Sequence, residues 1–177
     1  MTNNQNNMKR LLLVMAFAFA GAFAANAQCW MGGNMSFWHN DGDTRFSVAP
    51  EIGYSFYDNP VSLAAGFGYH YHNYENDLGN IVTTHNFVVS PYVRCNLAYV
   101  EQFAFFLDGG ADMAFLNDGM AWRAGLKPGI SFSPTGRWTA VAHMGFLGFD
   151  DGEYFGEKGF GMDFSAAVMN LGLYYNF

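Results

Sequence analysis

Apolar and polar positions alternate with a period of two along almost the whole chain after Gln28. In the clearest stretch, residues 103–115, the odd positions are apolar or glycine, and the even positions include Asp108 and Asp112. A β-strand places successive side chains on opposite faces, so this alternation indicates a β-sheet with one apolar face and one polar face. No stretch after Gln28 has a convincing 3.6-residue period, and the pattern predicts an all-β protein.

Turn-forming clusters divide the alternating region into segments. The predicted strands are 30–39, 44–57, 61–74, 83–98, 103–116, 120–133, 138–149 and 159–177. The breaks alternate in kind, from tight or neutral (59–60, 100–101 and 133–137) to acidic and glycine-rich (41–43, 75–80, 117–119 and 150–158). Short turns at one end and polar loops at the other are typical of outer-membrane barrels. The sequence therefore predicts an eight-stranded antiparallel up-and-down transmembrane β-barrel.

A soluble barrel of the lipocalin kind is the alternative, with its apolar stripe pointing inward around a ligand. The stripe is too aromatic and continuous for that, because an eight-stranded interior only just accommodates its own side chains. On two strands it consists of Val48, Pro50, Ile52, Tyr54 and Phe56, and of Phe87, Val89, Pro91 and Val93. We expect these side chains to face lipid.

The C-terminal strand carries the same pattern to the last residue. Leu171, Leu173, Tyr175 and Phe177 alternate with Asn170, Gly172, Tyr174 and Asn176. A terminal Phe on such a strand resembles the signal by which outer-membrane barrels are recognised for assembly. Upstream, Phe160, Met162 and Phe164 are out of phase with this run. Either a bulge near Ser165 and Ala166 resets the alternation, or the upper part rises above the lipid.

Composition adds limits to this interpretation. The chain has 177 residues, is 51% hydrophobic and 13% charged, and has a mean hydropathy of +0.01, so its apolar residues are not massed in helical membrane spans. The net charge of -7, with only 8 Lys and Arg, excludes a nucleic-acid partner, which requires a basic surface.

The first 27 residues read as a cleavable signal peptide. Lys9 and Arg10 form a positive region, residues 11–24 an apolar region, and Ala25-Asn26-Ala27 a cleavage site. A retained helical anchor is the alternative, but the apolar run is shorter than the ~20 residues that a spanning helix needs. Residues 28–177 are then the barrel domain.

Several short motifs keep a characteristic order and spacing across residues 28–177. They are APEIGY at 49–54, SPYVR at 90–94, LKPGIS at 126–131 and YYNF at 174–177. Together they resemble the small outer-membrane β-barrel proteins of OmpA-transmembrane and OmpX type, in the form common in Bacteroidetes. The resemblance implies an integral barrel of the bacterial outer membrane and no definite biochemical activity. The partners expected of it are outer-membrane lipid, lipopolysaccharide and the barrel-assembly machinery.

Charged residues on the polar phase should meet in the lumen. A hairpin centred between Asn117 and Asp118 pairs positions whose numbers sum to 235, which places Asp112 opposite Arg123 and Asp108 opposite Lys127. A turn near residue 101 also places Arg94 beside Asp108. An unpaired buried charge costs several kcal/mol, so these charges should be paired. The predicted ion network fills the lumen and consists of Glu51, Arg94, Asp108, Asp112, Arg123 and Lys127.

Outward aromatic residues near the strand ends form two predicted belts that fix the depth of a barrel in a membrane. The turn-side belt is Tyr54, Phe56, Phe103, Trp138, Tyr175 and Phe177, and the loop-side belt is Phe37, Phe46, Tyr69, Tyr71, Phe115 and Trp122.

The predicted function is a structural or surface-interaction role, with no catalytic residue, cofactor or metal. The acidic loops are the surface for an extracellular partner. A narrow porin-like channel for small solutes or ions is the alternative, and a lipid-modifying enzyme is less favoured because no serine adjoins a histidine in the sequence. A divalent metal at His70, His72 and His143 is disfavoured, because barrel histidines commonly just form hydrogen bonds.

Overall fold

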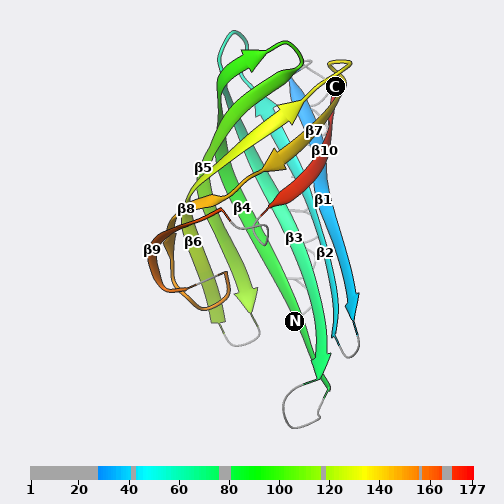
Figure 1. Ribbon diagram of the computed structural model, residues 1–177, viewed down its shortest axis with the longest axis vertical. Helices are drawn as coiled ribbons and strands as arrows, with labels where there is room; N and C mark the ends of the chain where they lie inside the picture. The colour runs from blue at the N-terminus through cyan, green and yellow to red at the C-terminus, as the bar shows by residue number, and fades with distance from the viewer. Residues whose placement is uncertain (1–27, 41–42, 76–80, 117–118, 156, 165–168) are drawn as a thin grey trace, which may run out of the picture.

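The computed structural model describes residues 28–40, 43–75, 81–116, 119–155, 157–164 and 169–177 (Figure 1). The predicted signal peptide 1–27 and the predicted bulge near Ser165 and Ala166 lie outside these residues. The strands are β1 (Cys29–Asn40), β2 (Asp43–Ser55), β3 (Val61–Glu75), β4 (Ile81–Val100), β5 (Phe103–Leu116), β6 (Gly119–Phe132), β7 (Trp138–His143), β8 (Phe146–Asp150), β9 (Gly159–Asp163) and β10 (Asn170–Asn176).

These strands form a closed eight-stranded antiparallel barrel, as the sequence predicts. Strands β1 to β6 pair in chain order. The short strands β7 and β8 both pair with β6 and together occupy the seventh position of the barrel. Strands β10 and β9 pair with β7 and β8 and occupy the eighth. The barrel closes where residues 30–33 of β1 pair with residues 173–176 of β10. Strands β1 to β6 have 12 to 20 residues each, and apolar and polar positions alternate along them because one side faces the lumen and the other faces outward.

The predicted strand 138–149 is interrupted, which the sequence interpretation missed. Gly129 is opposite His143, but Leu126 is opposite Leu147, so β7 and β8 hold one more residue than β6 between these pairs. An extra residue of this kind is a β-bulge. Pro128, which has no N–H to donate, accepts the Met144 N–H at 2.9 Å inside it. The bulge bends this wall of the barrel.

The two ends of the barrel differ as the breaks in the pattern predict. The turns between β2 and β3, β4 and β5, and β6 and β7 lie with the C-terminus at the top of Figure 1, and the opposite ends of β1 to β6 lie in the lower half with the β8–β9 connection. Asp58 and Glu101 adopt positive φ values of 52° and 54° in two of the tight turns. We call the two ends the turn end and the loop end.

The apolar stripe lies on the outside of the barrel and does not point inward around a ligand, as the lipocalin-like alternative requires. Phe87 is 57% exposed and Leu171 75%, whereas Phe106, on the inner face of β5, is 2% exposed. The inner face also buries Arg94, Asp108 and Asp112. Among the residues that the structure describes, no helix is long and apolar enough to span a membrane.

Candidate functional site in the barrel lumen

Arg94 lies at the centre of a buried layer near the turn end. Its Nε and Nη2 atoms each donate to one oxygen of Asp108 at 2.8 Å. Four aromatic rings surround the guanidinium, with centroids 4.0 Å (Phe106), 5.5 Å (Tyr92), 5.6 Å (Trp30) and 5.6 Å (Tyr174) from Cζ. Ring faces attract a cation, so these rings stabilise the charge that Asp108 also neutralises. We call this group the Arg94 layer.

His143 joins the Arg94 layer, which the sequence interpretation did not predict. Its Nε2 atom lies 2.8 Å from Asp108 Oδ2, and its ring meets the Phe106 ring edge-on. The alternation of strand 138–149 already places His143 on the lumen side. The bulge and the hydrogen bond with Asp108 depend on tertiary structure, so the sequence pattern alone does not give them. His143 is therefore a hydrogen-bond partner of the ion network.

A second ion cluster lies nearer the loop end. Asp112 accepts hydrogen bonds from Arg123 Nε at 2.7 Å and from Lys127 Nζ at 2.8 and 2.7 Å. The Arg123 guanidinium also lies over the rings of Phe146 and Phe155, 4.8 and 4.5 Å from their centroids. The single carboxylate of Asp112 is therefore hydrogen-bonded to two cationic side chains, those of Arg123 and Lys127.

The predicted backbone register is correct, but one predicted ion pair is wrong. Asp112 is opposite Arg123 and Asp108 opposite Lys127, as the sum of 235 requires, and Arg94 is opposite Asp108. Lys127 nevertheless pairs with Asp112 instead of Asp108. Arg94 and His143 already bond Asp108, and the long lysine side chain reaches Asp112, which lies four residues from Asp108 along the facing strand.

Glu51 lies in the same lumen but is not ion-paired with the predicted network. Its Oε2 atom accepts from the Tyr92 hydroxyl at 2.6 Å and the Tyr174 hydroxyl at 2.9 Å, and Asn34 donates to Oε1 at 3.5 Å. The prediction placed this carboxylate correctly and missed its partners. The alternation places both tyrosines on the inner face of their strands, and this was the sequence feature from which a contact with Glu51 could have been predicted.

Replacing Glu51 by alanine is expected to lower the free energy of unfolding by about 1–3 kcal/mol, because the Tyr92 and Tyr174 hydroxyls lose their acceptor in a largely buried site. Glu51→Gln keeps an acceptor oxygen and should cost less. Urea unfolding of both variants in lipid vesicles measures this difference, and equal costs would show that the two hydroxyl contacts do not contribute.

The Arg94 layer separates two cavities. The larger, of about 630 Å³, lies on its loop side and reaches Glu51, Asp112 and Lys127. The smaller, of about 320 Å³, lies at the turn end and is lined by Trp30 and Ser55 among others. These two cavities share no lining residue. The network therefore blocks the lumen at one level, and the prediction that it fills the lumen is wrong for the loop half.

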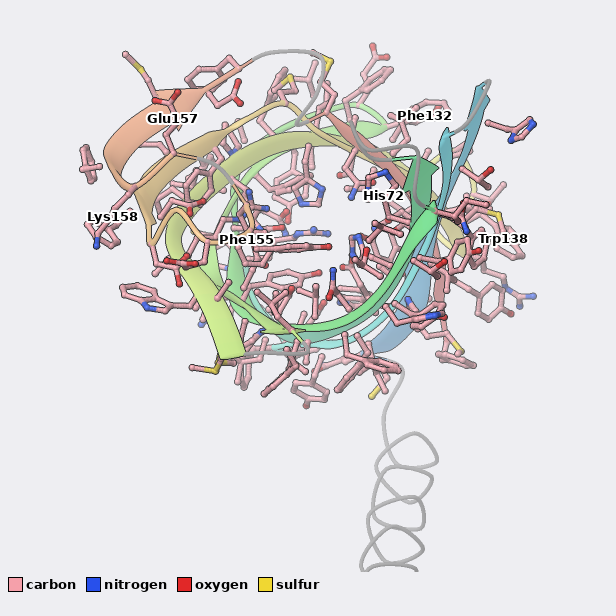
Figure 2. The ribbon with its side chains drawn as sticks, turned by 90° about the horizontal axis from the view of Figure 1, so that it is seen from below. His72, Phe132, Trp138, Phe155, Glu157 and Lys158 are labelled. Carbon is pink, nitrogen blue, oxygen red and sulfur yellow. The ribbon has the colours of Figure 1, made fainter. Side chains whose placement is uncertain are left out.

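The β8–β9 connection folds over the loop end. In Figure 2, Phe155 lies within the ring of strands, whereas Glu157, Lys158 and Trp138 lie outside it. Tyr154 packs edge-on against His70, and burial raises the pKa of its hydroxyl although a hydrogen bond with Asn86 opposes this shift.

Two acidic residues, Asp150 at the end of β8 and Asp151 directly after it, have local structural roles. The Asp150 carboxylate accepts the Gly152 N–H at 2.8 Å, and Asp151 accepts the Trp122 and Glu153 N–H groups at 2.7 and 3.1 Å. These bonds shape the connection. The other acidic residues of the predicted loops are Asp41, Asp43, Glu75, Asp77, Asp118, Glu153 and Glu157. Of these, Asp41, Asp77 and Asp118 lie outside the described residues.

The three inward histidines do not form one cluster. His70 packs against Tyr154, and His143 bonds Asp108. Within the described part of the chain, no group of three or more His, Cys, Asp or Glu residues is placed to hold a metal ion.

No protein-family model and no curated protein matches this chain. The resemblance to small outer-membrane barrels stays a prediction.

Proposed function

We propose that this protein is an integral barrel of the bacterial outer membrane, with a structural or surface-contact role and no catalytic activity. The observation that carries the proposal is the apolar outer wall. Leu63, Val93 and Phe105, on three adjacent strands, expose 41–50% of their surface on the outer face, while the charged residues of β4 and β5, Arg94, Asp108 and Asp112, are buried on the inner face. A water-soluble barrel places these two classes of residue the other way round.

The aromatic residues at the two ends support the same proposal. At the turn end, Trp138 packs on Tyr175 and Tyr175 on Phe177. At the loop end, Trp122 stacks on Phe149 and Tyr69 packs against Phe87. Aromatic girdles at both interfaces are typical of outer-membrane barrels. The Phe37 side chain lies outside what the structure describes, so its place in the predicted belt stays untested.

The C-terminal strand supports recognition by the barrel-assembly machinery. Leu171 and Leu173 are exposed on the outer face of β10, Phe177 directly after β10 is exposed as well, and β10 is the strand that closes the barrel against β1. A recognition signal needs an accessible side-chain row, and this row is on the outside. Contacts with lipopolysaccharide and with an extracellular partner are proposed for the acidic loop end.

A closed lumen is the expected result in planar bilayers. The Arg94 layer separates the two cavities, so the refolded protein should show no discrete conductance steps. The measurement uses a sample whose folding has first been shown by gel mobility. Steady channels from that sample would contradict the structural role and favour the narrow pore.

A further inference from the structure

Glu51 differs from the other carboxylates of the ion network because no cationic side chain of the described residues forms a salt bridge with it. Its Oε2 atom accepts from the hydroxyls of Tyr92 and Tyr174, which bring no charge. The nearest cationic residue along its own strand is Arg45, six positions and about 20 Å away. The Glu51 carboxylate is therefore hydrogen-bonded but not neutralised.

The cations of the lumen are taken up by its other carboxylates. Arg94 contacts the rings of Tyr92 and Tyr174, but it donates to both oxygens of Asp108. His143 also bonds Asp108 and not Glu51. Among the described side chains of the lumen, carboxylates outnumber arginines and lysines by one. The set is Glu51, Asp108, Asp112 and the buried Asp150 against Arg94, Arg123 and Lys127.

A hollow lies beside the Glu51 carboxylate on the inner face of β2, β3 and β4. In the register, Glu51 is opposite Gly66, and Gly66 is opposite Ser90. A Cβ atom at Gly66 would stand 3.4 Å from Glu51 Cγ and 3.5 Å from Ser90 Cβ, so the space exists because position 66 has no side chain. Glu51 Oε1 receives the Asn34 amide at 3.5 Å, at the limit of a hydrogen bond, and keeps capacity to accept.

The hollow is part of the larger lumen cavity, whose wall toward the loop end is apolar. Glu51, Gly66, Ser90 and Asn34 line one part of this cavity. Val88 lines another part and packs with Tyr154 and Phe155 of the β8–β9 connection. A volume of about 630 Å³ is in the range of small-molecule sites and exceeds what a bare ion fills. The cavity thus offers an uncompensated carboxylate and an aromatic wall.

We infer that this cavity binds a primary ammonium cation with an aromatic body, its N–H groups on Glu51 and its ring against Val88 and Phe155. A primary ammonium has three donors, and the Ser90 hydroxyl and the Asn34 amide oxygen line the same cavity as further acceptors. The inference goes beyond the proposed function, because it depends on the lumen and not on the membrane. 2-Phenylethylammonium has both features and is the probe used below.

The charge test measures equilibrium dialysis of protein folded in a nonionic detergent in sodium buffer, with the ligand present from the start of refolding. 2-Phenylethylammonium should bind at least about tenfold more tightly than 2-phenylethanol or 3-phenylpropanoate. Glu51→Gln keeps an acceptor oxygen, loses the charge and should remove this preference. Glu153→Gln, in the exposed β8–β9 connection, is the matched control and should leave binding unchanged. Equal binding of cation and alcohol to wild type, or an unchanged preference in Glu51→Gln, would overturn the inference.

The position test fills the hollow and leaves the carboxylate in place. Gly66→Val should weaken binding of 2-phenylethylammonium at least about tenfold, because its methyl groups occupy the space beside Glu51. Gly161→Val on the exposed strand β9, where a Cβ meets nothing within 4 Å, is the matched control and should bind as wild type does. Unchanged binding to folded Gly66→Val would show that the ammonium does not lie here.

These outcomes are distinguishable from failure of the proposed function, because folding is read first from the change of gel mobility on boiling. A wild-type sample that does not fold in detergent or lipid contradicts the barrel itself, on which both proposals depend. A wild-type sample that folds and yet has no preference for 2-phenylethylammonium contradicts the ammonium site alone.

Discussion

Replacing Asp108 by alanine is expected to lower the free energy of unfolding by about 3–5 kcal/mol, the largest loss from any single side chain of the lumen. Asp108 is 2% exposed and is the carboxylate that neutralises Arg94. Its removal leaves the Arg94 guanidinium buried among aromatic rings and removes a partner of His143. Urea unfolding in lipid vesicles, followed by gel mobility, measures the loss.

A double variant separates the loss of an ion pair from simple damage to packing. Arg94→Met/Asp108→Leu removes both charges and keeps apolar volume, so it should recover much of the stability that Asp108→Ala loses. Glu157→Gln in the exposed connection is the surface control and should stay within about 0.5 kcal/mol of wild type. A double variant as unstable as Asp108→Ala would mean that the Arg94 layer stabilises through shape and not through charge.

Val93→Arg is expected to destabilise the protein by about 2–4 kcal/mol in a bilayer, because an arginine at mid-depth on the lipid side must leave water. Val93 is 41% exposed on the outer face of β4. Its partner on β5 is Gly109, midway between Phe103 and Phe115 of the two aromatic belts. The measurement is again urea unfolding in vesicles.

The same substitution distinguishes the membrane barrel from a soluble one. On a water-exposed surface, Val93→Arg should change stability by no more than about 0.5 kcal/mol. Val93→Leu keeps the position apolar and should be nearly neutral in either case. A negligible cost for Val93→Arg in vesicles would contradict a lipid-facing outer wall.

The barrel and its register were predictable because a period of two fixes which face of the sheet each side chain occupies. Once the aromatic phase of residues 103–115 is assigned outward, the even positions must line the lumen, and Asp112 must face Arg123 across the hairpin. The turns add the topology, since short and acidic breaks alternate along the chain. Local patterns thus determined which residues meet across each neighbouring strand pair.

The contacts across the lumen were not predictable from neighbouring strands. Glu51 on β2 bonds Tyr92 on β4 and Tyr174 on β10, and His143 on β7 bonds Asp108 on β5. Such pairs depend on tilt, stagger and the bulge in the β7–β8 wall, which set the height of each side chain.

Lipid-dependent folding tests the central claim most directly. The chain of residues 28–177 is unfolded in urea and diluted into buffer with or without lipid vesicles, and the gel mobility of unboiled and boiled samples is compared. We predict a boiling-dependent change in mobility only in the sample refolded with lipid, because the apolar outer wall needs a bilayer to cover it. A folded, monomeric protein in lipid-free buffer, or no mobility change with lipid, would contradict the membrane barrel.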